Sequence, residues 1–448
     1  MSDHPPRNRY IELLQQFSIP LILGVIVALI ICNIDNGFYD RVVHHTYSFF
    51  ITEDHAPLDH TAHDSHEGQD TSHEQHVPSD NSGDHPQHGN HGAVDSHAGF
   101  DWLHYATLHF WVNEIFMVLF FGIAAKEITE SCLPGGALNP VRKAINPLLG
   151  TIGGVVGPVG TYFLLNALIG QSEWKNGWGI PTATDIALAW LVAKMVFGVG
   201  HPAISFLLLL AVADDGIGLA IIAFAYPDPN HPTVWSNALW IIPGMAIAYG
   251  LRRFNVRSWL PYILLGGGFS WFGLYSAHLH PALALVPIVP FLPGPKRDAG
   301  LYLEPPVENQ VSPLEKFEHD LKLFVDFGLF FFAFANAGVP FSNINNLTWI
   351  VLFSLIIGKT VGITLFSSLG ILLGFPLPDR MKVKHLVVAG IVAGLGLTVA
   401  LFVSGEAFTE AGPQGAAKMG ALFSAGAGLL AIIVGRIVGV KDACPPSN

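Results

Sequence analysis

Apolar segments recur along almost the entire 448-residue chain, and each is close to the ~20 residues that an α-helix needs to cross a bilayer. Only 12% of the residues are charged, whereas a soluble domain carries roughly a quarter. The chain therefore carries about half the charged residues of a soluble domain, and its largely apolar surface suits lipid rather than water. The sequence thus predicts an all-α integral membrane protein that contacts membrane lipid, and it gives no indication of nucleic-acid binding.

The apolar segments can be placed as about 12 transmembrane helices. Their expected ranges are 12–33, 106–125, 147–169, 180–198, 202–224, 233–251, 258–276, 279–293, 319–340, 347–374, 385–405 and 415–439. The first segment is too long for a signal-peptide core and lacks a small-residue cleavage site, so we interpret it as a spanning helix. The expected organisation is an N-terminal segment (1–11), a first transmembrane helix (12–33), a loop (34–105), a core of eleven helices (106–440) and a tail (441–448).

The distribution of basic residues predicts the orientation of these helices, because Lys and Arg accumulate in short cytoplasmic loops. With the N-terminus inside, eighteen of the 22 Lys and Arg residues fall on the cytoplasmic side. Arg41, Lys175 and Lys418 fall outside, and Lys359 lies within a helix. The sequence therefore predicts a multi-pass protein of the cell inner membrane with both termini in the cytoplasm.

The loop at 34–105 is predicted to be external and contains a polar, histidine-rich insertion. No Lys or Arg occurs between Arg41 and Lys126, and such a segment buries too little apolar surface to fold alone, so disorder is expected. Neutral imidazole suits zinc, nickel or copper. The histidines have no fixed repeat and no cysteine partner, so we expect at most loose metal binding. They are His55, His60, His63, His66, His73, His76, His85, His88, His91 and His97.

Ionisable residues inside apolar segments are costly in lipid and usually face a cavity or a partner. Asp214 and Asp215 are adjacent near the middle of the predicted fifth helix, with apolar runs on either side. Adjacent helical residues point about 100° apart, so one carboxylate can face a cavity while the other meets a neighbouring helix. Two close carboxylates in a low-dielectric medium resist ionising together. Such a pair can exchange a proton for a cation near neutral pH.

Two predicted helices contain signals for a break inside the membrane. In the fourth, Pro181 removes a backbone donor, and the threonines around it, including Thr184, can satisfy freed backbone groups. Asp185 then lies beside the positive N-terminal end of a half-helix, or it lies in the first turn of an ordinary helix that begins at a conventional N-cap. In the eleventh helix the expected break comprises Gly394, Gly396 and Thr398.

Lys359 lies well within the predicted tenth helix. There it needs a carboxylate partner or the C-terminal end of a half-helix, unless it is close enough to a helix end to extend to the membrane surface. Interrupted segments in the two halves of a transporter mark its binding site. We therefore expect inverted repeats, formed by helices three to five and ten to twelve, whose broken helices four and eleven cross at the midplane.

Five motifs occur in a characteristic order. They are Gly179-Ile-Pro-Thr-Ala-Thr-Asp-Ile-Ala-Leu-Ala189, Ala213-Asp-Asp-Gly-Ile-Gly218, Phe334-Ala-Asn-Ala-Gly-Val339, Ile357-Gly-Lys-Thr-Val-Gly-Ile363 and Gly394-Leu-Gly-Leu-Thr398. In the order and spacing of these motifs, residues from about 105 to 440 closely resemble the NhaA family of sodium/proton antiporters. An Asp-Asp pair alone is a weak signal, whereas five motifs in sequence are a strong one.

The resemblance implies an electrogenic exchange of Na⁺ or Li⁺ for H⁺ by alternating access, used for pH and sodium homeostasis. It implies that Asp215 is the principal ion and proton carrier, and that Asp214 pairs with Lys359, either of which can exchange the second proton. Thr184 and Asp185 are implied to line or support the site. The implied protein is a secondary transporter rather than an enzyme, and it uses no cofactor.

The chain departs from the family in two places. Well-studied members carry two glutamates four residues apart on the second helix that are tied to pH activation, and here Ala124 and Ile128 occupy those positions. The histidine-rich insertion lies where relatives have a short external hairpin used in dimer contacts. Residues 38–52 are expected to form such a hairpin, and the protein is expected to form a homodimer.

Three other classes of function share single features with this sequence. An intramembrane aspartyl protease also uses two membrane aspartates, but the Tyr-Asp and Gly-X-Gly-Asp motifs of that class are absent. A sodium-coupled symporter of organic anions needs a more polar or basic lining than these helices offer. A metal-binding or metal-sensing membrane protein rests on the histidine-rich insertion alone. The sequence favours the antiporter.

Overall fold

The computed structural model describes residues 18–44, 107–134, 136, 138, 141–198, 200–227, 232–295, 312–378 and 380–440. These residues form helices and the segments that connect them, and no β-strand occurs among them. The predicted N-terminal segment, the histidine-rich insertion and the C-terminal tail lie outside the described residues. The all-helical class expected from the apolar segments is thus found.

The first described helix, α2 (Ile19–Ile34), lies within the predicted 12–33 span except at its last residue. It packs along α12 (Pro313–Ala337), where a Cβ atom at Gly24 would lie 2.4 Å from the carbonyl oxygen of Phe330. The hairpin expected from residue 38 onward is wrong for its described part, because Asn36–His44 form a helix, α3. Asp35 accepts a hydrogen bond from the Phe38 amide (2.9 Å) at its start, and the Tyr39 hydroxyl donates to the Phe334 carbonyl (2.6 Å).

Five helices are long and apolar enough to cross a membrane, by length and composition. Two bent pairs, described below, bring this number to as many as seven within the described residues, so the expected number of twelve stays a prediction. The first span, Leu108–Ser131, is formed by α4 (Leu108–Phe110), η2 (Trp111–Phe116) and α5 (Met117–Ser131). The second comprises residues Ala144–Ile169 of α6 (Val141–Ile169), and the third is α8 (Pro202–Ala225). The fourth consists of α13 (Asn346–Phe353), η8 (Ser354–Gly358) and α14 (Lys359–Leu372), and the fifth of α17 (Ala411–Phe423) and α18 (Gly426–Val438).

One predicted helix does not form. Residues 279–293 contain only two short 3₁₀ turns, η5 (Pro281–Leu283) and η6 (Val289–Phe291). The reason is their proline content, since Pro281, Pro287, Pro290 and Pro293 each remove a backbone donor and clash with the preceding turn. The neighbouring predicted helices are shorter than expected. They appear as α9 (Trp235–Ala238), α10 (Ile241–Arg253), η4 (Tyr262–Gly267) and α11 (Gly268–Ser276).

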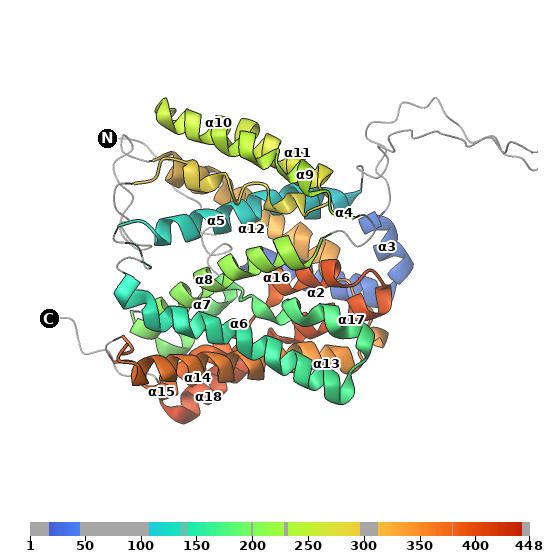
Figure 1. Cartoon of the computed structure of the whole chain (residues 1–448). Helices are drawn as coiled ribbons and strands as arrows, with labels where there is room; N and C mark the ends of the chain where they lie inside the picture. The colour runs from blue at the N-terminus through green and yellow to red at the C-terminus, as the bar shows by residue number, and fades with distance from the viewer. Residues whose placement is uncertain are drawn as a thin grey trace, which may run out of the picture.

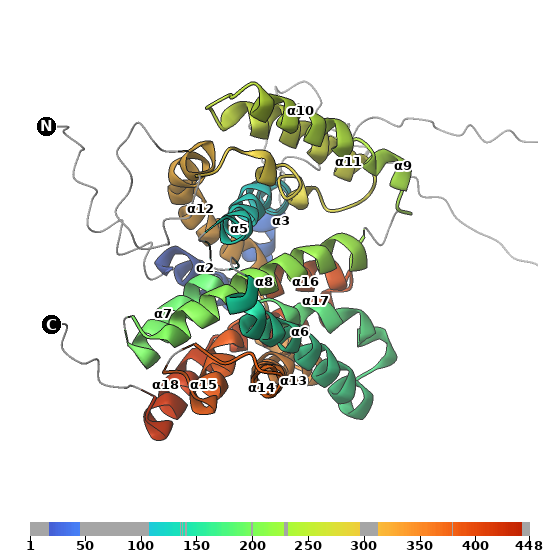
Figure 2. The same ribbon diagram turned by 60° about the vertical axis from the view of Figure 1, so that its left-hand side comes forward.

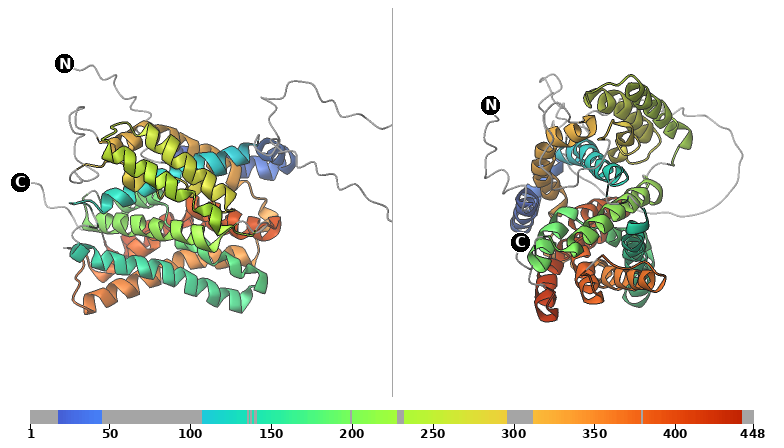
Figure 3. Two further views of the ribbon diagram at one scale, coloured as in Figure 1. Left: turned by 45° about the horizontal axis from the view of Figure 1, so that its top comes forward. Right: turned by 90° about the vertical axis from the view of Figure 1, so that its left-hand side faces the viewer.

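The helices form two groups with α8 between them (Figures 1 and 2). One group contains α10 and α11 with α5 and α12, and the other contains α6, α13, α14, α15 and α18. In the right-hand view of Figure 3, the yellow-green α10 and α11 lie on the opposite side of the molecule from the orange α14. Because α8 contacts both α5 and α6, the aspartates that it carries lie where the two groups meet.

Close contact between α6 and α14 depends on glycine. A Cβ atom at Gly153 would lie 2.2 Å from the carbonyl oxygen of Gly362, and one at Gly157 would lie 2.3 Å from that of Gly358. Small residues let two helix backbones approach in a membrane, where lipid supplies no hydrophobic force to press them together. This contact holds the start of α14, where Lys359 lies, against the centre of the molecule.

Candidate ion-binding site

Two broken helices meet at the centre of the structure. The first pair consists of η3 (Ser172–Thr182) and α7 (Ile186–Phe197), bent by 60°, and the second of α15 (Val383–Ala393) and α16 (Leu397–Ala407), bent by 51°. Pro181 lies at the end of η3 and has a non-helical backbone conformation there. The predicted breaks are therefore present at the expected motifs.

The two breaks are joined by hydrogen bonds. The Asp185 amide donates to the Leu395 carbonyl (2.7 Å), and the Thr398 hydroxyl donates to Asp185 Oδ2 (3.1 Å). Asp185 also caps α7, because its Oδ1 accepts from the Leu188 amide (3.1 Å). One backbone bond and two bonds of the Asp185 side chain thus replace intrahelical bonds that a break inside a membrane leaves unmade. Asp185 is therefore the N-cap of the half-helix α7 and lies at the break.

Glycine at the second break permits the close approach of its neighbours. A Cβ atom at Gly394 would lie 2.9 Å from the Leu355 carbonyl oxygen. At Gly396 it would lie 2.6 Å from Leu355 Cδ2 and 3.1 Å from the Ala183 carbonyl oxygen of the other broken helix. A larger side chain at either position would separate the two breaks.

Asp214, Lys359 and Thr184 form a buried cluster beside the breaks. Lys359 Nζ lies 2.6 Å from Asp214 Oδ2, and both side chains are fully buried. Lys359 also donates to the Thr184 hydroxyl (2.6 Å). That hydroxyl has one proton, which it can donate either to Asp214 Oδ2 (3.0 Å) or to the Ala393 carbonyl (3.0 Å). The ion pair expected from the sequence is therefore present, and Thr184 connects it to the Ala393 carbonyl at the second break.

A π-helical turn, η8, immediately precedes Lys359. Such turns are rare and occur often at functional sites, because the extra residue changes which face the following side chains occupy. Lys359 follows this turn directly and is fully buried rather than extended to a membrane surface.

Asp215 points elsewhere, as adjacent positions on a helix must. It lines a small cavity whose other walls are apolar or aromatic: Phe120, Phe121, Ala124, Leu219 and Val399. Its Oδ1 atom is buried and has no hydrogen-bond partner among the described residues. The like charges of Glu127, Asp214 and Asp185 act on it, opposed by that of Lys359. One aspartate thus meets a neighbouring helix and the other meets a cavity.

Two acidic residues of the Leu108–Ser131 span are absent from the site predicted from the sequence. Glu127 interacts electrostatically with Asp215. Glu114 lies within the predicted 106–125 helix, and its Oε2 atom is buried without a hydrogen-bond partner in the described part of the chain. The criterion that selected Asp185 and Lys359, an ionisable residue inside an apolar segment, also selects Glu114.

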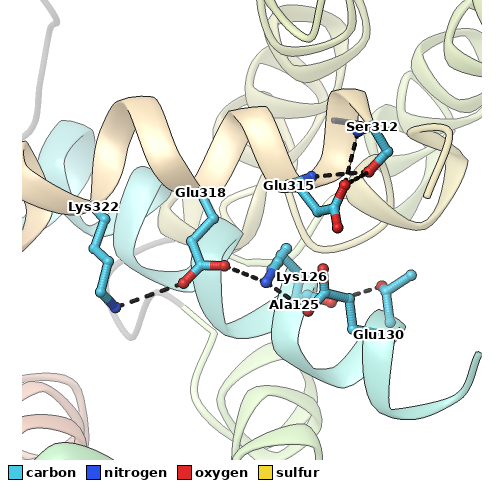
Figure 4. A network of polar contacts seen from close by, with 8 residues as sticks. Ala125, Lys126, Glu130, Ser312, Glu315, Glu318 and Lys322 are labelled. Carbon is cyan, nitrogen blue, oxygen red and sulfur yellow. Dashed lines mark hydrogen bonds and ion pairs between the residues drawn. The ribbon is translucent and has the colours of Figure 1, made fainter. Parts of the chain in front are cut away.

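The helix α5, which contains the positions expected to replace the family's glutamates (Ala124 and Ile128), also carries an ionic network. Figure 4 shows this network. Lys126 Nζ lies 2.6 Å from Glu130 Oε2 and also binds Glu318 on α12, whose other oxygen lies 3.6 Å from Lys322 Nζ. The network joins α5 to α12 at the end of α5. Of its acidic members, Glu130 pairs with Lys126 and does not line the cavity of Asp215.

The residues proposed to bind metal loosely, His55 to His97, lie outside the described residues. Among the described residues, no group of three or more His, Cys, Asp or Glu side chains is arranged to hold a metal ion.

Comparison with known proteins gives consistent matches over nearly the whole chain. The family model described as Na+/H+ antiporter 1 matches residues 85–438. The chain is 53% identical over 435 residues to the Na(+)/H(+) antiporter NhaA of Geobacter metallireducens, which covers 96% of this chain and 98% of that protein. It is 52% identical over 437 residues to the protein of the same name from Geobacter sulfurreducens, covering 97% and 99%. A relative from Jannaschia sp. with that name is 40% identical over 449 residues, covering 95% and 97%.

Proposed function

The chain belongs to the Na+/H+ antiporter 1 family and exchanges sodium for protons across a membrane, and on this premise we propose that Asp215 binds the sodium ion and the proton in turn. The resemblance seen in the sequence is thereby confirmed. The observation that carries the proposal for Asp215 is its buried, unpartnered Oδ1 atom in a cavity with otherwise apolar walls.

The chemistry follows from the cost of a buried charge. An ionised carboxylate without a counterion is unfavourable in a low-dielectric cavity, so Asp215 favours the binding of one cation. A proton or Na⁺ meets this need, and Li⁺ has the same charge. Because Na⁺ and the proton compete for one carboxylate, Asp215 binds one of them only after it has released the other. Alternating exposure of Asp215 to the two sides then couples the two fluxes.

The second proton of an electrogenic exchange is assigned to the Asp214–Lys359 pair. When Na⁺ enters, its charge can replace that of Lys359 near the two aspartates, which favours release of the lysine proton. The Thr184 hydroxyl can then donate to Asp214 or to the Ala393 carbonyl, so it can follow the change in charge. Asp185 and Thr398 hold the two half-helices together during the exchange.

The proposed orientation has both chain termini in the cytoplasm of a cell whose inner membrane contains the protein. Basic residues in the last turns of several helices support it: Lys194 in α7, Arg252 and Arg253 in α10, and Arg436 in α18. Large apolar side chains exposed on the outer helices, among them Leu372, supply a surface suited to lipid. In this orientation the corner between α16 and α17 faces the external side of the membrane. The exchange of sodium for protons then serves sodium and pH homeostasis.

The test is Na⁺-induced proton efflux from proteoliposomes that contain a pH-sensitive dye. Asp215→Asn keeps the size of the side chain and removes its charge, so it is expected to abolish the response to Na⁺ and to Li⁺ while the protein stays folded. Glu173→Gln, a charge change at an exposed residue of η3, is the matched control and is expected to keep wild-type activity. Wild-type exchange by the Asp215→Asn variant would refute the assignment.

A further inference from the structure

His280 connects separate parts of the structure at the end that is external in the orientation proposed above. It precedes η5, which packs against α5 and α11. Its Nε2 atom binds the carbonyl oxygen of Tyr226, the residue that follows α8, and because a carbonyl only accepts, Nε2 is the donor. On the other side of the ring, Nδ1 lies 3.6 Å from Glu406 Oε2, near the end of α16. One side chain from the group of α10 and α11 thus contacts the outer ends of α8 and α16.

Tyr226 is in turn fixed to the first broken helix. Its hydroxyl accepts a hydrogen bond from the Gly179 amide (2.8 Å) and donates one to the Asn176 carbonyl (2.6 Å). Its ring stacks on that of Trp178, with the centroids 6.2 Å apart. A Cβ atom at Gly179 would lie 2.6 Å from the Tyr226 hydroxyl oxygen, so a larger residue there would separate the two segments. By binding Tyr226, His280 therefore holds the end of α8 and η3 as one unit.

The ring of His280 also belongs to a series of aromatic contacts that reaches the cavity of Asp215. Phe402 of α16 contacts the His280 ring (centroids 6.1 Å apart) and the ring of Phe121 on α5 (5.4 Å). Phe121 lines the cavity of Asp215. The His280 side chain is only 9% exposed. The three rings thus extend from the wall of the cavity to the outer ends of α8 and α16.

The contacts of His280 differ in kind from those of Tyr226 with η3. Alternating access is largely a rocking of one helix bundle against another around a fixed site. Hydrogen bonds within one group can persist through this motion, whereas a bond between groups at one face must break when that face opens. One buried hydrogen bond is strong enough to shift such an equilibrium several-fold and weak enough to break in every cycle.

We propose that His280 is a latch, which closes the external route to Asp215 by binding the Tyr226 carbonyl and is released whenever Asp215 opens to the outside. The inference rests on the exchange and the orientation proposed above. His280 is thus a positioning residue that acts through the equilibrium between the two open states. Asp215 remains the residue that carries the ion.

The first experiment compares the two faces of the membrane. The apparent KM for Na⁺ is measured at fixed pH with right-side-out and with everted vesicles. His280→Leu keeps a side chain of similar bulk and removes the donor, which favours the externally open state. The external KM is expected to fall roughly three- to tenfold, the shift that the loss of one buried hydrogen bond produces, while the cytoplasmic KM is unchanged or raised. His280→Gln keeps an N–H donor and should restore the external KM.

The second experiment measures access to the cavity directly. Leu219 lines the cavity and lies one helical turn from Asp215 toward the outer end of α8. After replacement of the three cysteines of the chain by serine, Leu219→Cys supplies a single thiol for a membrane-impermeant reagent added outside. His280→Leu should raise the rate of labelling by about the factor by which it lowers the external KM.

The matched control removes a hydrogen bond within one helix group. Asn237 of α9 donates from Nδ2 to the Ser276 carbonyl at the end of α11 (2.8 Å), also at the external end. Asn237→Ala should leave both the labelling rate and the two KM values unchanged, because the segments that this bond joins do not separate. A purely structural role of His280 would instead make the two variants alike.

A cross-link tests the latch even if His280→Leu fails to fold. The side chains of His280 and Glu406 approach within 3.6 Å, so a short, cleavable bifunctional thiol reagent can join them in His280→Cys/Glu406→Cys. The link should stop exchange, and a reductant should restore it. Exchange that continues with the link in place, unchanged labelling in His280→Leu, or KM values that change equally on both faces would overturn the latch. Failure at Asp215 looks different, because Asp215→Asn is expected to lose exchange at every Na⁺ concentration.

Discussion

The ion pair between Asp214 and Lys359 gives the prediction that follows most directly from the structure. The two charged atoms lie 2.6 Å apart and neither side chain is exposed. At an effective dielectric constant of about 20, the attraction between them is roughly 6 kcal/mol. Most of this offsets the hydration that both groups lose on burial, so the pair as a whole adds little to the free energy of unfolding.

Removing one partner has a much larger effect than removing both. Lys359→Gln leaves the Asp214 charge buried with only Thr184 as a donor, and the free energy of unfolding is expected to fall by about 3–5 kcal/mol. Asp214→Asn should cost a similar amount, because it leaves an uncompensated ammonium. Asp214→Asn/Lys359→Gln leaves two neutral polar groups and should recover a large part of the loss.

The assay is thermal unfolding of the purified protein in detergent, followed for the four members of this double-mutant cycle. Lys322→Gln is the matched control: its ion pair with Glu318 spans 3.6 Å and its side chain is 47% exposed. Such a pair contributes about 1 kcal/mol or less. If the losses of the two single variants simply add in the double variant, the two charges do not interact in the folded protein and the reasoning is wrong.

Two other predictions concern packing and the insertion. Gly157→Ala places a methyl group 2.3 Å from the Gly358 carbonyl oxygen and should lower the free energy of unfolding, measured by thermal unfolding, by about 1–3 kcal/mol. Gly160→Ala, on the same helix but with open space beside it, should be neutral or stabilising. Equal effects of the two substitutions would refute the role of this contact. Replacing residues 55–97 by a short Gly-Ser linker should raise the apparent KM for Na⁺ at low salt, because the acidic residues of this segment attract cations. The difference in KM should shrink as added salt screens the charges. Identical Na⁺ titration curves of the two proteins at every salt concentration would exclude this effect.

The positions of the ionisable residues along the helices could be predicted from the sequence. Asp214 and Asp215 are surrounded by apolar residues close in the chain, so their depth in the membrane follows from helix length alone. The breaks at Pro181 and at Gly394–Gly396 were predictable for a similar reason, since proline and glycine act on the backbone locally. The four prolines of residues 279–293 explain why no continuous helix forms there, although the length and apolar character of the segment are typical of a spanning helix.

The partners of those residues depend on contacts between distant segments. Asp214 rather than Asp215 contacts Lys359 because the glycines of α6 bring α14 to one face of α8. No local sequence pattern predicts which face of α8 that is. Glu406 of α16 lies 3.6 Å from His280 in the same way, across two segments far apart in the sequence.

The sequence by itself thus determined that the chain is helical, that it belongs in a membrane and that carboxylates and a lysine lie within its spans. It could do so because hydropathy, propensity and backbone breaks act over a few helical turns. Apart from the family resemblance, only the tertiary structure decided which carboxylate is neutralised by Lys359 and which faces a cavity. The physical reason is that electrostatic compensation of a buried charge depends on ångström-scale distances, and helix packing sets those distances.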